Sequence, residues 1–508
     1  MTSKRFGIID IGSNSIRLVI YEQTENGAYR VIDESKASAR LSGHIDADGR
    51  LPHSGIQLII ETLAYFKMLC EASRAYSIRA VATAAVRNAG NSGEIVQAVE
   101  EASGIKVEIL SGHEEARYGY LGVRNTLDIA EGFIVDIGGG STEISYFKDR
   151  HLLHSVSFPF GSVNTAKQFL KNGNLDEEDL SKIRSMAIKA MEGEPWIRKA
   201  PGLPLIGLGG TIRSVSKIDQ KAKKYSLGLT HNYQMAAQDV TQWLQSLRAM
   251  PLDKRRKVQG LAKERADIIV PGLVIMQAVF QHTAASHYVI SGSGLRDGLF
   301  FQTVRPERPE ADEVLEASVR NLMALHPAMP HAHVEQVNRL SLTLFDALQS
   351  RFGLSRRARS YVHTASLLYR IGVTIHYYQY AKHTFYVMAH SRIDGLSHRE
   401  ILICAMIASY KTKSRTRALY SEHKDILAES DLDLIVKLGT LLQLAIAFDR
   451  SETQPVTRLD AVLAEHTLSL TLYAGHDAAI EWKEAEAVGK EFTKQWGLSL
   501  TADLRMEP

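Results

Sequence analysis

Three consecutive glycines between two apolar segments are the feature that most limits the fold of this chain. They stand in FIVDIGGGSTEISY, residues 133–146, where Asp136 is the one charge within the first apolar run. Glycines lack a Cβ, so the backbone can turn sharply and approach an anion with its N–H groups, and Ser141 adds a hydroxyl donor. We therefore predict a β-hairpin whose turn binds phosphate. An ordinary glycine-rich hairpin is the alternative that this segment alone leaves open.

The same pattern occurs near the N-terminus. Residues 6–21 read FGIIDIGSNSIRLVIY, so an apolar strand again carries an aspartate, Asp10, and leads through a Gly/Ser turn into a second strand. An internal repeat of this kind indicates two homologous halves, which we expect to face each other across a cleft. Rossmann and P-loop folds are disfavoured, because in those motifs the glycine turn leads into a helix.

Length and composition indicate a globular protein of several domains. At 508 residues the chain is too long for a single core, and its 45% hydrophobic and 23% charged residues are an ordinary globular balance. The formal net charge of +3 permits a polyanionic ligand without requiring one. We predict that Cys70 and Cys404 are reduced core thiols. No apolar run is long enough to cross a bilayer, and the N-terminal segment passes directly into a strand. We therefore expect a cytoplasmic protein with no membrane or nucleic-acid partner.

The segment SGHEEARYGYLGV, residues 111–123, predicts a helix with a functional carboxylate near its start. Ser111 and Glu114 have the spacing of a capping box, which accounts for Glu114. Glu115 points elsewhere, because adjacent helical side chains diverge, and it shares a face with the glycines four and seven residues further on. A carboxylate at the mouth of a phosphate-binding cleft is placed to orient or deprotonate a water molecule. A solvated helix charge is the alternative.

Two further glycine turns follow strand-like segments. Residues 203–213, LPLIGLGGTIR, place Gly209 and Gly210 at a helix start, where free N–H groups favour an anion. Residues 288–300, YVISGSGLRDGLF, repeat the order of strand, turn and helix, with Arg296 close to the turn. In isolation each motif is weak, because turns of this kind are common.

Taken in order, the motifs resemble a known family. DIGSNSIRLVIY, SGHEEARYGYLGV, VDIGGGSTEIS and SGSGLRDG are similar to the exopolyphosphatase and guanosine pentaphosphate phosphohydrolase family of the actin-like ATPase superfamily, over residues 5–305. The resemblance implies an α/β fold in which two actin-like (ribonuclease H-like) domains, residues 1–130 and 131–305, flank a cleft. It also implies a homodimer.

The activity implied by the resemblance is hydrolysis of a terminal phosphoryl group, a reaction that depends on positioning and charge neutralisation. Glu115 would be the general base, and Arg87, at the end of the segment TAAVR, would lie near the scissile phosphate. Mg²⁺, with Mn²⁺ as an alternative, would be held directly or through water by Asp10, Asp136 and Glu143. The expected phosphate-binding residues are Gly12, Ser13, Asn14, Ser15, Gly138, Gly139, Gly140, Ser141, Gly209, Gly210 and Arg296.

Beyond residue 305 the pattern becomes helical. YVHTASLLYRIGV, residues 361–373, resembles the core helix of HD-type metal-dependent phosphohydrolases, but Tyr369 and Arg370 stand where that superfamily has its His-Asp metal pair. Because an arginine is not a hard-metal ligand, we predict an all-α HD-like domain over 306–455 without a metal of its own. Its histidines are then expected to be scattered core and surface residues: His363, His376, His383, His390 and His398.

A basic stretch and a small tail complete the chain. Lys411 and Lys413 belong to a stretch suited to a long polyanion such as polyphosphate, whose binding there would depend on salt. Residues 456–508 are predicted to form a small α+β domain. Its strand-like segments are 466–473 and 478–486, and a helix is expected at 488–496.

The favoured function is a Mg²⁺-dependent exopolyphosphatase that acts on inorganic polyphosphate. Hydrolysis of guanosine pentaphosphate is the alternative or a second activity, because both substrates present a terminal phosphoanhydride. A kinase of the same superfamily is disfavoured by Glu115, since a kinase must exclude water. A non-hydrolytic alarmone or nucleotide sensor is a more distant alternative.

Overall fold

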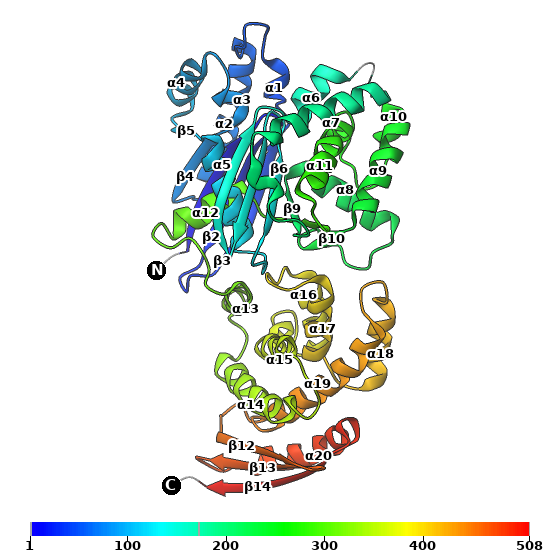
Figure 1. Cartoon of the computed structure of the whole chain (residues 1–508). Coiled ribbons are helices and arrows are strands. Elements are labelled where there is room, and N and C mark those ends of the chain that lie inside the picture. The colour runs from blue at the N-terminus through cyan, green and yellow to red at the C-terminus, as the bar shows by residue number, and fades with distance from the viewer. Residues whose placement is uncertain (1–2, 171–172, 507–508) are drawn as a thin grey trace. The chain divides into compact units, whose positions relative to one another are not determined.

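The computed structural model describes residues 3–170 and 173–506 and divides into two compact units. The first unit comprises Met1–Lys224 and Thr230–Val314, and the second comprises Tyr225–Leu229 and Leu315–Pro508. Figure 1 shows both, with colour following the chain from blue to red. The predicted division into four domains is finer than this one and stays a prediction. Among the described residues, no helix is long and apolar enough to span a bilayer.

Two sheets form the framework of the first unit. In spatial order, the first sheet consists of β3 (Tyr29–Ala37), β2 (Ile16–Gln23), β1 (Lys4–Ile11), β4 (Ser77–Ala82) and β5 (Val107–Ile109). The second sheet consists of β10 (Tyr233–Met235), β11 (Tyr288–Ile290), β9 (Leu205–Leu208), β6 (Gly132–Ile137), β7 (Thr142–Lys148) and β8 (His151–Phe158).

The two sheets repeat one topology, which confirms the predicted pair of related α/β halves. Each begins with three antiparallel strands, β1 to β3 or β6 to β8, joined at the predicted hairpins. Its first strand then pairs in parallel with a later one, β1 with β4 and β6 with β9. Parallel pairing buries both faces of a strand, which explains why β1 and β6 read as nearly continuous apolar runs.

The helices of the first unit cover these sheets. Those of the first half are α1 (Leu41–His44), α2 (His53–Ala72), α3 (Ala84–Arg87) and α4 (Ser92–Ser103). Those of the second half are α6 (Ser162–Phe169), α7 (Glu177–Glu192), η1 (Pro195–Arg198), α8 (Gly209–Ala222), α9 (Ala237–Ala249), α10 (Leu252–Arg255), η2 (Lys263–Arg265) and α11 (Ile269–Thr283). Two more, α5 (Gly112–Arg124) and α12 (Leu295–Val304), contribute to one core with both sheets. In that core Leu121 and Phe300 pack with Ile8 and Ile206, so α5 and α12 join the two halves.

The second unit begins as the all-helical region that the sequence predicts. It contains α13 (Val314–Leu325), α14 (His331–Gln349), α15 (Arg356–Leu368), η3 (Ile371–Thr374), α16 (Tyr380–His390), α17 (His398–Ala408), α18 (Lys413–Glu422) and α19 (Glu429–Ala447). Cys404 on α17 and Cys70 on α2 are both buried and free, as expected of core thiols.

The tail is a three-stranded sheet with one helix. It consists of β12 (Val456–Ala464), β13 (Thr467–Ala474), α20 (Ala479–Trp496) and β14 (Ser499–Met506), and Figure 1 shows it in orange and red beside α14 and α19. The predicted strand at 478–486 is wrong, because this segment is the first half of α20. Buried or partly buried side chains recur there every three or four residues, as at Trp482, Ala485, Phe492 and Trp496.

Candidate active site

The turns of the two hairpins share one geometry. In the first turn the Gly12 N–H donates to the Ser15 carbonyl at 3.2 Å, and in the second the Gly138 N–H donates to the Ser141 carbonyl at 2.9 Å. Each turn thus closes on itself directly after the strand that carries the aspartate. This arrangement leaves further backbone N–H groups of the turns available to an anion.

The two turns also pack directly against each other. A Cβ on Gly139 would lie 2.9 Å from the Ser13 Cβ, and a Cβ on Gly161 would lie 2.6 Å from the Gly139 carbonyl carbon. Both distances are shorter than any real Cβ contact. The second turn therefore requires glycine where it meets the first turn and the segment before α6.

The turns line a cavity of about 120 Å³. Its lining is almost entirely polar and charged, which suits phosphoryl groups. Most of the predicted site residues come together here: Asp10, Gly12, Ser13, Asn14, Ser15, Glu115, Asp136, Gly138, Gly139, Ser141, Glu143, Gly209, Gly210 and Arg296.

Four of these residues are carboxylates in a buried setting. Burial raises the pKa of Asp10, and burial is also the largest cause that raises the pKa of Asp136 to about 6 and that of Glu143 to about 7. Burial and repulsion from Glu143 raise the pKa of Glu115 well above its ordinary value, although Arg87 opposes this. The buried negative charge is therefore incompletely compensated by the protein, which suits a bound cation.

Four arginines line the same cavity: Arg17, Arg213, Arg265 and Arg296. Burial, followed by repulsion from Arg296 and the other guanidinium groups, lowers the pKa of Arg17 and of Arg213 to about 10. Mutually repelling cations around one cavity favour an anion of high charge, because a phosphate would relieve the repulsion and accept several charge-assisted hydrogen bonds.

Only Arg296 among these arginines was predicted from the sequence. Arg17 had a detectable signal, because it lies directly opposite Asp10 in the antiparallel register of the first hairpin. Arg213 lies one helical turn beyond Gly209 and donates to the Gly209 carbonyl at 2.8 Å, so the motif LGGTIR contained it. Arg265 comes from the short helix η2, and no local pattern marks it.

Glu114 and Glu115 have different roles: Glu114 takes part in the capping box, and Glu115 lines the cavity. The Ser111 hydroxyl accepts from the Glu114 N–H, and the Glu114 carboxylate accepts from the Ser111 N–H at 2.8 Å, as predicted. Gly119 and Gly122, on the same helix face as Glu115, pack against other parts of the protein and do not make space for a ligand. A Cβ on Gly122 would lie 2.5 Å from the Gly294 carbonyl oxygen, so this face receives the turn before α12.

Arg87 does not line the cavity and contacts Glu115 instead. Its NH1 donates to Glu115 Oε2 at 2.8 Å and to the Leu110 carbonyl at 2.8 Å. Arg87 therefore holds the carboxylate in place and favours its ionised form. The predicted position of Arg87 near the scissile phosphate stays a prediction.

The Gly209 and Gly210 turn makes space for two charged groups. Gly209 has φ +76°, and a Cβ there would overlap the Asp136 carboxylate, while a Cβ on Gly210 would overlap the Arg265 guanidinium. Both charges reach the cavity only because these side chains are absent.

Gly140 differs from Gly138 and Gly139, because it lines a separate cavity of about 320 Å³ between α1, α3 and α6.

Asn14 is the clearest unsatisfied group of the site. It is 8% exposed, and neither of its amide atoms has a hydrogen-bond partner among the described residues. A buried amide without a partner costs about 1–3 kcal/mol. Since Asn14 lines the cavity, a phosphate oxygen would provide the missing acceptor for its NH₂ group.

The carboxylates fit a magnesium ion that arrives with substrate. Within the described residues, no three His, Cys, Asp or Glu side chains are grouped closely enough to hold a metal by themselves. Mg²⁺ is commonly held by one or two carboxylates together with waters and substrate phosphates. Asp10, Asp136 and Glu143 line one cavity with the phosphate-binding turns, so they match that kind of donor set.

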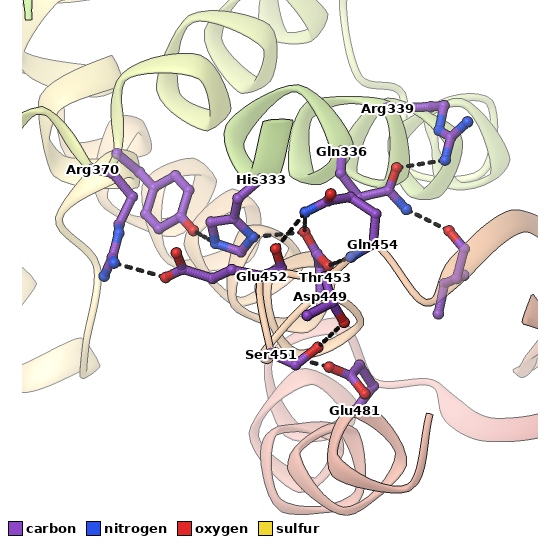
Figure 2. A network of polar contacts seen from close by, with 12 residues as sticks. His333, Gln336, Arg339, Arg370, Asp449, Ser451, Glu452, Thr453, Gln454 and Glu481 are labelled. Atoms are coloured by element: carbon purple, nitrogen blue, oxygen red, sulfur yellow. Dashed lines mark hydrogen bonds and ion pairs between the residues drawn. The ribbon is translucent and has the colours of Figure 1, made fainter. Parts of the chain in front are cut away.

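Tyr369 and Arg370, the residues that were compared with the HD metal pair, take part in a hydrogen-bonded network (Figure 2). The buried His333 is engaged at both ring nitrogens, by Asp449 at 2.7 Å on Nδ1 and by the Tyr369 hydroxyl on Nε2. Arg370 donates to Glu452 at 2.7 Å. Tyr369 and Arg370 are thus parts of the packed second unit. Lys411 and Lys413 also belong to this unit, and both are exposed.

Comparison with known proteins identifies two family models. The Ppx/GppA phosphatase family matches residues 19–307, and Ppx/GppA phosphatase, domain III, matches residues 314–485. Among solved structures, a Ppx/GppA family member from Aquifex aeolicus is 28% identical with a TM-score of 0.53, and the match covers 60% of this chain and 99% of that one. A structure described as the PPX-GPPA enzyme of Aquifex aeolicus is 29% identical with a TM-score of 0.50. This match covers 59% of the present chain and 99% of the other. An exopolyphosphatase from Cytophaga hutchinsonii shares the fold at 21% identity, with a TM-score of 0.55 and coverage of 61% and 100%.

Proposed function

Because the chain belongs to the Ppx/GppA phosphatase family, we propose that it is a Mg²⁺-dependent exopolyphosphatase. It would hydrolyse the terminal phosphoanhydride of inorganic polyphosphate and release orthophosphate. The observation that carries this proposal is a single cavity that arginines, glycine-rich turns and carboxylates line together.

The charged lining of the cavity suits the phosphoryl groups at the end of a chain. The turn N–H groups, Asn14 and the four arginines hold the terminal phosphates and take up negative charge that develops during transfer. Guanosine pentaphosphate offers the same kind of end, so it is the alternative substrate.

Glu115 is the proposed general base. Its carboxylate accepts a proton from a water molecule while the water oxygen forms a bond to the terminal phosphorus. The bridging P–O bond breaks, and the electron pair leaves with the shortened chain. A pKa raised by burial brings a carboxylate closer to the working pH of a base. Asp10, Asp136 and Glu143 would hold Mg²⁺, which neutralises charge on the phosphate oxygens when it is bound.

Phosphate release by the purified protein tests this proposal. Long-chain polyphosphate and guanosine pentaphosphate are compared with Mg²⁺ at matched concentrations of terminal phosphate, and EDTA removes the metal. We expect release from polyphosphate to exceed release from guanosine pentaphosphate and to stop in EDTA. A preference for guanosine pentaphosphate would assign the enzyme to alarmone hydrolysis, and binding without any release would favour a sensor.

Two adjacent glutamates provide a matched pair of variants. Glu115→Gln should lower turnover about 10²-fold or more, because it removes the general base while leaving the shape of the site. Glu114→Gln is the control, since Glu114 serves the capping box and does not line the cavity. Near-normal turnover of Glu115→Gln would remove this residue from the mechanism.

The family resemblance also leads us to propose a homodimer, which sedimentation equilibrium would test.

A further inference from the structure

Part of the second unit carries large aromatic side chains on its surface. In the segment that leads into α16 and along it, Tyr377 is 62% exposed, Tyr378 is 74% exposed and Tyr386 is 59% exposed. Tyrosine combines a large flat face with a polar tip, and exposed aromatic groups that gather in one place mark binding surfaces.

Cations lie over Tyr377, which is one of these rings, and over the neighbouring Tyr380. The guanidinium carbon of Arg370 lies 5.8 Å from the ring centroid of Tyr377 and 4.8 Å from that of Tyr380. Lys411 Nζ lies 5.2 Å from the Tyr380 centroid, and the rings of Tyr377 and Tyr378 meet edge to face at 5.8 Å. These five residues are linked by contacts, with Arg370 mostly buried and Tyr380 partly buried, and we call the group the tyrosine–lysine surface.

The same chemistry continues along α16. Lys382, Tyr386 and His390 follow at four-residue steps and therefore lie on one face of this helix. The rings of Tyr386 and His390 stack with their centroids 4.4 Å apart.

The basic groups beside this surface are not neutralised by the protein. In the described part of the chain, no ion pair involves the four basic residues of 411–417. The carboxylates that precede them in sequence are already engaged, Asp394 by Arg392 at 2.5 Å and Glu400 by Arg357 at 2.6 Å. Arg370 is paired with Glu452 at 2.7 Å and is mostly buried, so the positive charge comes from Lys411 and the basic residues that follow it.

We propose that the tyrosine–lysine surface binds single-stranded nucleic acid. Bases would stack on the exposed tyrosine rings, and the neighbouring lysines and arginines would contact the phosphates. Polyphosphate, the ligand expected for Lys411 and Lys413 from the sequence, has no flat apolar faces and does not account for the tyrosines. The proposal differs from the expectation of no nucleic-acid partner, and a formal net charge of +3 does not reveal a local basic surface.

Fluorescence anisotropy with the full-length protein tests the proposal. The probe is a labelled oligouridylate of about 12 nucleotides, within the usual site sizes for single strands, and an abasic strand of equal length has the same charge. The variant Tyr377→Ala/Tyr378→Ala should raise the Kd for the oligouridylate about tenfold or more, while Tyr377→Phe/Tyr378→Phe should keep it within about threefold. Lys411→Ala/Lys413→Ala should weaken binding and reduce its salt dependence.

Two controls test whether binding is specific to the tyrosine–lysine surface and to its rings. Tyr65 and Tyr76 are 54% and 70% exposed in the first unit, so Tyr65→Ala/Tyr76→Ala should leave the Kd unchanged. Equal binding of the oligouridylate and the abasic strand, together with no effect of the Tyr377→Ala/Tyr378→Ala change, would overturn the proposal in favour of a general polyanion surface. Absence of oligouridylate binding at low salt would also overturn it. The assay does not depend on phosphate release, so its outcome is distinct from that of the exopolyphosphatase proposal.

Discussion

Arg87 provides a direct test of the proposed mechanism, because the family resemblance and the structure give it different partners. The resemblance places it near the scissile phosphate, whereas the structure gives it a 2.8 Å hydrogen bond to Glu115 Oε2. Both side chains are largely buried, with 18% of Arg87 and 15% of Glu115 exposed. Arg87→Met keeps much of the bulk of the side chain and removes its charge.

The size of the effect follows from the contact between Arg87 and Glu115. A hydrogen bond between charged groups contributes about 1.5–3 kcal/mol. About 1.4 kcal/mol corresponds to one pH unit, so the acidic limb of the kcat/KM profile should move up by about one to two pH units. The direction is upward because the arginine favours the ionised carboxylate, and its loss raises the pKa of Glu115 further. Turnover should recover on the alkaline side, where the base is again deprotonated.

The assay is orthophosphate release from polyphosphate, measured for wild type and Arg87→Met across the acidic and alkaline ranges. Arg79→Met is the control, because Arg79 pairs with Glu108 at 3.0 Å and does not line the cavity. Thermal melting separates loss of function from loss of fold. A loss by the same factor at every pH would refute the reasoning, since it would mean that Arg87 acts on the phosphate itself. An unchanged profile would show that Arg87 does not influence the base.

Three further variants test other parts of the first unit. Glu143→Gln should raise the free energy of unfolding at pH 8 without Mg²⁺ by roughly 2–3 kcal/mol. The reason is that a folded-state pKa of about 7 favours the protonated carboxyl, so the wild type loses stability as the pH rises through this value. Urea titration should therefore show a smaller stabilisation by Glu143→Gln at pH 5 than at pH 8. Gly122→Ala should lower the melting temperature, since its Cβ would lie 2.5 Å from the Gly294 carbonyl oxygen, whereas Gly93→Ala, with no atom within 4 Å of its Cβ, should not. Asn14→Ala should raise KM about tenfold without lowering stability in thermal melts, because its amide is unpaired without ligand; unchanged KM would contradict its role in binding.

The parts of the site that depend on local pattern could be predicted from the sequence. The two hairpins follow from apolar strands on both sides of Gly/Ser turns, and the Ser111 capping box leaves Glu115 as the carboxylate that reaches the cavity. These features involve residues that are neighbours in the chain or that pair across one turn.

The remaining parts depend on contacts between distant segments, which local patterns do not encode. Arg265 reaches the cavity only because Gly210 has no Cβ, and the two residues are far apart in sequence. The resemblance placed Arg87 near the scissile phosphate, and its hydrogen bond to Glu115 is not visible in the sequence. The first half of α20 was mistaken for a strand, since a short apolar and charged segment fits both periods.

The contact between the two hairpin turns also limits how the repeated halves can change over evolution. Because Gly139 leaves no space for a Cβ beside Ser13, a larger residue at either position needs a compensating change at the other. A substitution that one isolated half would tolerate is therefore rejected in the whole chain. A combinatorial library that varies positions 13 and 139 together should therefore recover correlated pairs of residues.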